Sequence, residues 1–207
     1  MNKKEIRSLT FEVRAEENEQ HGAHLVGKPI VYGQVIQYGW RREVIDPGAV
    51  DADTDLKDVR FLIGHNTSMV PLARSRNNNA NSTMQLTVDE EGLRIRANLD
   101  VENNTDARSL YSAIERGDIS GMSFMFVVDN DKWDDIDTEH PTRTITGIKR
   151  VMEVSAVIFP AYSQTSLEAR GLAEALESAK ASLESAKAEA REIERKKQKI
   201  RILLEVQ

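Results

Sequence analysis

Three polar side chains of this chain occur in segments that are otherwise apolar, and their types are those of nucleophilic catalysis. Ser123 and Glu153 each lie in a strand-like run of bulky apolar residues, and His65 follows another such run where it gives way to Gly and Asn. A carboxylate in such surroundings is costly unless it is paired or hydrogen-bonded. A hydroxyl, an imidazole and a carboxylate are the nucleophile, base and orienting acid of a serine-hydrolase triad, which is defined by geometry and not by chain order.

Each of the three residues also has a purely structural interpretation. A strand serine can fill space or make a local hydrogen bond, a histidine at a strand end can lie at the surface, and a glutamate can reach solvent at a sheet edge. The chain has neither the Gly-x-Ser-x-Gly elbow of the α/β-hydrolases nor a Gly-Asp-Ser-Gly-Gly segment. The residues alone therefore leave open both a hydrolase and an inert β-domain.

The elements that would position these residues are mostly short strands separated by turn residues. Alternating or continuous apolar patterns predict strands over residues 7–13, 25–38, 59–63, 84–88, 93–99, 121–128, 142–150 and 151–159. Between them, Thr105 as N-cap and Gly117 at the C-terminal end bound a predicted helix with Leu110, Tyr111 and Ile114 on its buried face. We expect a mainly β domain with helices, an α+β fold, over residues 1–165.

The composition changes to Ala, Glu, Lys and Leu from Ser166 onward. Apolar residues there follow two interleaved heptad series, at positions 176, 183, 190, 197 and 204 and at positions 172, 179, 186, 193 and 200, with Lys197 as the exception. This pattern is typical of a coiled coil or a helix that pairs with a partner helix. We expect a helical tail over residues 166–207 that supports weak self-association, with a single solvated helix as the alternative.

Composition excludes several classes of function. The chain has 207 residues, 40% of them hydrophobic and 30% charged, and no cysteine, which excludes disulfides, thiolate metal sites and cysteine nucleophiles. No apolar run approaches the roughly 20 residues of a membrane span, and the polar N-terminus does not resemble a secretory signal. The net charge of -6 and the lack of a basic stripe argue against nucleic-acid binding. The acidic segment 129–139 lacks the central Gly and closing Glu of a calcium loop, so a solvated loop is expected there. Hydrolysis by a serine, histidine and carboxylate requires no metal or organic cofactor, and none is expected.

Five segments, in order, resemble the prohead (head maturation) serine proteases of tailed bacteriophages. They are an acidic and apolar turn ending in Pro-Gly-Ala, an apolar strand ending in His, a Pro-apolar-small-Arg element, a Ser-Gly-apolar-Ser segment, and a Glu-Val-Ser strand ending in Pro-Ala. Their positions are Glu43–Val50, Phe61–Asn66, Pro71–Arg74, Ile119–Phe124 and Glu153–Ala161. The chain departs from the family pattern at Tyr162, since an Asn commonly follows Pro-Ala, and at an apparent loop extension over residues 77–81.

The resemblance implies a fold related to the herpesvirus assembly protease, a β-barrel with peripheral helices, here followed by the long C-terminal helix. It implies Ser123 as nucleophile and His65 as base, with Glu153 in the third catalytic place, where the herpesvirus relative has a second His. The oxyanion donors are expected in the loop around Ala161 and Tyr162.

The implied substrates are the scaffold segment of the major capsid protein, or a separate scaffold protein, and the protease itself. The implied compartment is the procapsid interior in the host cytoplasm. Two non-catalytic hypotheses remain: a capsid assembly or scaffold protein whose heptad helix binds partners, and a β-domain binding module with an oligomerisation tail. Only the protease hypothesis requires the three polar side chains to converge.

Overall fold

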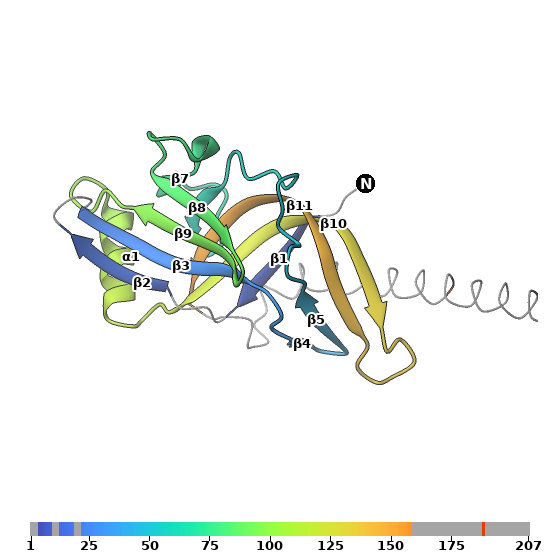
Figure 1. The fold of residues 1–207 in the computed structure, drawn as a ribbon. Coiled ribbons are helices and arrows are strands. Elements are labelled where there is room, and N and C mark those ends of the chain that lie inside the picture. Colours follow the sequence, from blue (N-terminus) through green and yellow to red (C-terminus); the bar gives the residue numbers. More distant parts are fainter. Residues whose placement is uncertain (1–3, 10–12, 19–21, 159–187, 189–207) are drawn as a thin grey trace, which may run out of the picture.

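The computed structural model describes residues 4–9, 13–18, 22–158 and 188 (Figure 1). The strands among them form a seven-stranded sheet and a four-stranded sheet. The expected helical tail, apart from position 188, and the expected oxyanion residues Ala161 and Tyr162 lie outside the described residues. No helix within the described part of the chain is long and apolar enough to cross a membrane.

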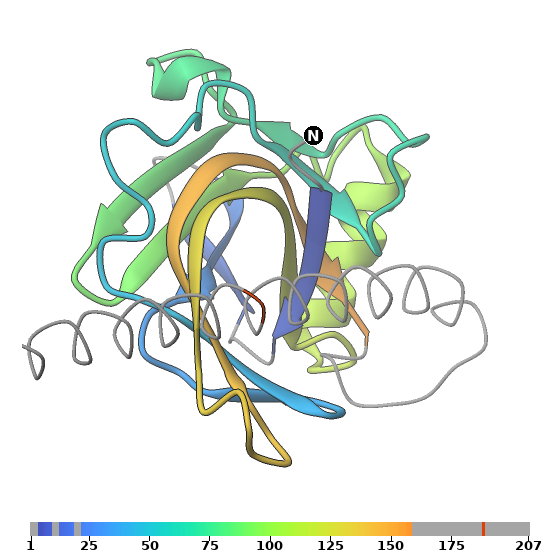
Figure 2. The same ribbon diagram turned by 90° about the vertical axis from the view of Figure 1, so that its right-hand side faces the viewer.

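The larger sheet is organised around one long antiparallel pair, β10 and β11, which curls strongly along its length (Figure 2). Strand β1 pairs with the other edge of β10, and β5 and β6 pair in parallel with β11 at different points along it. Strands β4 and β7 extend the sheet beyond β5 and β6. The bounds are β1 (Lys4–Leu9), β4 (Ile36–Tyr38), β5 (Arg41–Ile45), β6 (Arg60–Ile63), β7 (Ala73–Arg74), β10 (Gly121–Asp134) and β11 (Thr142–Val157).

The smaller sheet is antiparallel throughout, in the order β2-β3-β9-β8. Its strands are β2 (Val13–Asn18), β3 (Gly22–Val31), β8 (Met84–Asp89) and β9 (Gly92–Asn98). The strands expected over residues 84–88 and 93–99 are therefore confirmed, and they pair as the hairpin β8–β9. At its turn Gly92 has φ +145°, and a Cβ there would lie 2.0 Å from the carbonyl oxygen of Ile30. Only glycine fits so close to the neighbouring strand.

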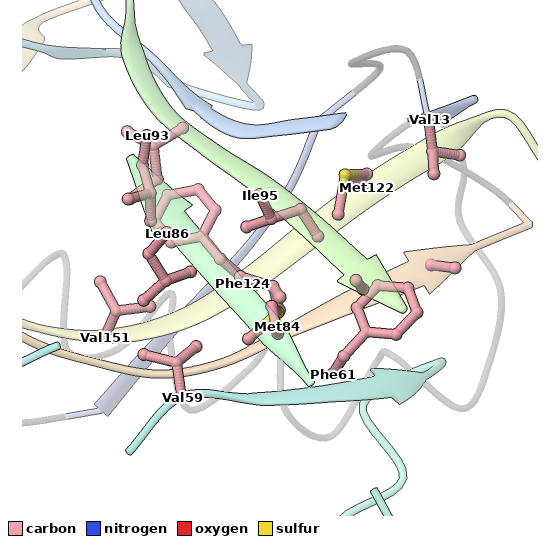
Figure 3. Close-up of a cluster of buried hydrophobic side chains, with 14 of the residues drawn as sticks. Val13, Val59, Phe61, Met84, Leu86, Leu93, Ile95, Met122, Phe124 and Val151 are labelled. Carbon is pink, nitrogen blue, oxygen red and sulfur yellow. The ribbon is translucent and has the colours of Figure 1, made fainter. Parts of the chain in front are cut away.

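The hydrophobic core lies where the two sheets face each other (Figure 3). Met122, Phe124 and Phe126 of β10 are fully buried in it, together with aliphatic side chains of the smaller sheet such as Met84 and Ile95. Because strand side chains alternate between faces, burying these three leaves Ser123 and Met125 on the opposite face of β10. Core packing thus determines which way Ser123 faces.

The helix α1 (Thr105–Glu115) packs against β2 and β3 of the smaller sheet. Its N-cap is Asn104, not Thr105 as expected: the Asn104 side chain accepts hydrogen bonds from the backbone N–H groups of Asp106 and Ala107. An Asn side chain at this position satisfies two otherwise unpaired amides. Leu110 and Ile114 are buried as expected, whereas Tyr111 is half-buried. The short 3-10 helix η1 (Arg76–Asn78) overlaps the start of the loop extension expected over residues 77–81.

The mainly β character with a short helix is confirmed, but three finer expectations are corrected. The two strands expected over residues 142–159 are the single strand β11. The strand expected over residues 121–128 continues as β10 to Asp134, into the acidic segment 129–139. Register shifts in the β10–β11 ladder let both strands continue through the bend. The strand pairings among the described residues also do not close a barrel, since β1 and β4 end the path of the larger sheet.

Candidate active site

His65 lies in the tight turn that follows β6. The β6–β11 ladder continues to Gly64, whose N–H donates to the carbonyl oxygen of Ala156 at 3.0 Å. Gly64 and His65 then both adopt positive φ, 56° and 59°. This left-handed conformation is uncommon for a residue with a side chain and is often found at functional sites. The His65 N–H donates to Oγ of Ser155 at 3.1 Å, which holds the turn against β11.

Glu153 lies in β11 and is buried, yet both of its carboxylate oxygens have partners. Oε1 lies 2.6 Å from Nδ1 of His65, and Oε2 accepts a hydrogen bond from Oγ of Ser155 at 2.5 Å. These contacts compensate for removing the carboxylate from water. An ionised carboxylate only accepts hydrogen bonds, so it selects the imidazole tautomer with its proton on Nδ1 and its lone pair on Nε2. Nε2 is buried and has no hydrogen-bond partner among the described residues.

Ser123 lies on the strand next to this pair. It is directly opposite Ser155 in the antiparallel β10–β11 register, and residues so paired present their side chains on the same face, with Cβ atoms about 4.5–5.5 Å apart. Ser123 therefore shares a face with Ser155 and, two residues along, with Glu153. Its side chain is fully buried, and its Oγ donates to the carbonyl oxygen of Arg7 in β1 at 2.8 Å. In this arrangement the hydroxyl proton points to β1.

The second serine of the Ser-Gly-Met-Ser segment is thus the one within the sheet. Ser120 precedes β10 and is exposed. The structure brings His65 and Glu153 into direct contact and places Ser123 on the neighbouring strand, on the face that carries Glu153.

A buried ionic cluster fixes β1 beside the serine strand. Its centre is formed by Glu5 and Arg7 of β1, Glu43 of β5 and Arg143 of β11. Arg7 pairs with both glutamates, and Arg143 donates to Glu5 at 2.7 and 2.9 Å and to Glu43 at 3.3 Å. Burial opposes ionisation of Glu5, but Arg7 and Arg143 outweigh it and lower its pKa to about 2. Because Arg7 is anchored in this way, the carbonyl that accepts the Ser123 hydroxyl is held in place.

Sequence reasoning missed Ser155 and this ionic cluster. The spacing Glu153-x-Ser155 in a strand was an available signal, because it puts both side chains on one face. The cluster had only a weak signal, since its members are far apart in the chain. No group of three or more His, Asp or Glu side chains that could hold a metal ion occurs within the described ranges.

A comparison with protein families matches residues 9–180 to the Caudovirus prohead serine protease family. No curated protein and no solved structure matches the chain.

Proposed function

Because the chain belongs to the Caudovirus prohead serine protease family, a family of phage capsid maturation proteases, we propose that Ser123 is its nucleophile, His65 the general base and Glu153 the acid that orients the base. The two non-catalytic hypotheses lose their support, since the family is one of serine proteases. The finer assignment of the three residues rests on the geometry of the site.

One observation carries the assignment: His65 contacts a buried carboxylate through Nδ1 at 2.6 Å while Nε2 has no hydrogen-bond partner among the described residues. This is the arrangement that a general base needs, with one nitrogen oriented by an acid and the other available to take a proton. Ser123 supports it further, because it lies opposite Ser155, whose Oγ contacts both Glu153 and the His65 backbone.

The hydroxyl of Ser123 has to change partner before it reacts. It donates to the Arg7 carbonyl at 2.8 Å, and turning to another staggered position of χ1, about 120° away, releases that hydrogen bond. Losing one such hydrogen bond costs about 0.5–1.5 kcal/mol, a small cost beside a catalytic barrier. Ser123 is also fully buried, so substrate access requires movement of a segment next to β10.

The reaction then follows the course of a serine protease. Oγ of Ser123 bonds to the scissile carbonyl carbon as its proton passes to Nε2 of His65, and Glu153 stabilises the resulting imidazolium. Collapse of the tetrahedral intermediate breaks the C–N bond, and the leaving amine takes the proton from Nε2. Water, deprotonated by His65, next attacks the acyl ester, which releases the carboxylic acid and restores Ser123. We assign the oxyanion donors to the loop around Ala161 and Tyr162, as the sequence suggests.

The substrates we assign are the scaffold segment of the major capsid protein or a separate scaffold protein, and the protease itself. These follow from the role of the family in procapsid maturation. The compartment is the procapsid in the host cytoplasm.

The test is cleavage of the co-expressed capsid protein, followed as a size shift on a gel and repeated with purified proteins in a sample free of other proteases. Ser123→Ala should abolish processing of both capsid protein and protease, because the variant lacks the hydroxyl that attacks the scissile carbonyl in the proposed mechanism. Ser120→Ala is the matched control and should retain most of the activity, because Ser120 is exposed and lies outside β10. Equal processing by wild type and Ser123→Ala would refute the proposed nucleophile.

A further inference from the structure

We infer that Ser155 is a positioning residue of this protease: its one hydroxyl holds both the acid and the base in their catalytic places. The inference rests on the proposed function, since it concerns the pair formed by His65 and Glu153. It adds a residue that does not touch substrate and acts through the two that it contacts.

The hydrogen-bonding capacity of Ser155 is used on both sides. The residue is fully buried, its Oγ donates to Oε2 of Glu153 at 2.5 Å, and the same Oγ accepts from the His65 N–H at 3.1 Å. A hydroxyl has a single proton, and here that proton is committed to the carboxylate. Ser155 is therefore not a second nucleophile, although it lies opposite Ser123.

The contact with Glu153 determines the orientation of the carboxylate. With Oε2 held by Ser155, rotation of the carboxyl group is restricted and Oε1 faces Nδ1 of His65. Hydrogen bonds to a charged group are among the stronger ones in proteins. Without the hydroxyl, the carboxylate keeps one partner and is free to turn about its terminal torsion.

The contact with His65 determines the conformation of the backbone that carries the imidazole. The last backbone hydrogen bond of the β6–β11 ladder is from Gly64 to Ala156, and the next N–H, that of His65, is taken by the side chain of Ser155. This extends the pairing by one residue into the turn, where His65 has φ 59°. Glu153 and His65 are thus both held by the Ser155 hydroxyl of β11, which fixes the position of one relative to the other.

A second serine provides a control: its hydroxyl also accepts from a backbone N–H and donates one hydrogen bond, but to a backbone carbonyl and away from the proposed pair. Ser75 is fully buried, its Oγ accepts from the Val59 N–H at 2.9 Å, and it donates to the Leu56 carbonyl at 3.2 Å. Val59 precedes β6, whereas His65 follows it. Removing either hydroxyl deletes one backbone contact and one donated hydrogen bond, but only Ser155 contacts the proposed pair.

The experiment measures the rate at which a fluorophosphonate ester labels Ser123 in the full-length chain, detected by mass spectrometry of the Ser123 peptide. This probe needs no knowledge of the cleavage motif. We expect Ser155→Ala to slow labelling about 10- to 100-fold, the effect of losing a hydrogen bond to a charged group. Ser155→Thr, which keeps the hydroxyl, should restore most of the rate. Ser75→Ala should also lower the melting temperature, but should leave the labelling rate unchanged.

A spectroscopic measurement separates positioning from general stability. The His65 proton shared with Glu153 should give a strongly downfield NMR resonance in the wild type, because short charge-assisted hydrogen bonds deshield their protons. That resonance should move or broaden in Ser155→Ala and be unchanged in Ser75→Ala. If Ser155→Ala does not fold, Ser155→Cys preserves the volume with only a weak donor and should show the same slow labelling.

Labelling of folded Ser155→Ala or Ser155→Cys at the wild-type rate, with the resonance unmoved, would overturn the positioning role. Equal loss of labelling in Ser75→Ala would overturn it too, since the effect would then be one of stability. The proposed function is tested separately by Ser123→Ala. If that variant processes capsid protein normally, the nucleophile assignment fails; if it is inactive while Ser155→Ala is fully active, only the role of Ser155 fails.

Discussion

The ionic cluster that anchors β1 predicts a specific dependence of stability on pH, and Glu5 is the residue that reports it. Its side chain is 19% exposed and accepts hydrogen bonds from Arg143 at 2.7 and 2.9 Å as well as from Arg7. Burial alone would raise the pKa of Glu5, but the two arginines lower it from 4.5 to about 2. The perturbation is Glu5→Gln, which keeps the shape of the side chain and removes its charge.

The magnitude follows from linkage between protonation and folding. The pKa of Glu5 is lower in the folded than in the unfolded chain, so its contribution is present above pH 4.5 and is lost as the pH falls towards 2. A pKa difference of about 2.5, at about 1.4 kcal/mol per pKa unit, corresponds to about 3 kcal/mol. We therefore expect Glu5→Gln to be less stable than wild type by up to about 3 kcal/mol at pH 7, and nearly equal to it at pH 2.

The assay is urea unfolding followed by circular dichroism at a series of pH values from 7 to 2. Glu43 belongs to the same cluster, and its pKa is also lowered because its arginine partners outweigh its burial. Glu43 therefore contributes to the pH dependence of both proteins, and the informative quantity is the difference in unfolding free energy between wild type and variant. Glu90→Gln, at an exposed position in the β8–β9 turn, is the matched control and should track the wild type. A stability difference between wild type and Glu5→Gln that stays constant from pH 7 to 2 would refute the reasoning.

Two further predictions concern the acid of the site and the tightest turn. Glu153→Gln should reduce cleavage by at least about a hundredfold, towards the roughly 10⁴-fold loss known when a triad acid becomes an amide, with the melting temperature little changed. Normal cleavage by this variant would refute the role proposed for Glu153. Gly92→Ala should lower the free energy of unfolding by at least about 2 kcal/mol, because its Cβ would overlap the Ile30 carbonyl. Gly33→Ala, with positive φ but open space around the new Cβ, should lose only about 1 kcal/mol in the same denaturant titration, and equal losses would contradict the steric explanation.

Much of the local structure and part of the site could be predicted from the sequence. The alternating apolar residues of β10, the β8–β9 hairpin and the helix α1 are encoded within short windows, where periodicity and turn residues act directly. The contact between His65 and Glu153 was also expected, because each stands out chemically from its neighbours and matches a family motif. Element ends were less accurate: the N-cap of α1 is one residue earlier than expected, and β11 is one strand instead of two.

Only the tertiary structure decided which distant residues meet. Ser155 touches a residue 90 positions away, Ser123 one 116 positions away, and Glu5 pairs with Arg143 across 138 positions. Such contacts depend on strand order and register, and a shift of one residue in β11 would turn Ser155 and Glu153 to the core face. The register is set by the burial of Met122, Phe124 and Phe126 against the other sheet. The free energy of this burial is a sum over contacts of the whole core. The sequence therefore determines the residue types of the site, whereas the packing of the two sheets determines which of these residues form hydrogen bonds with one another.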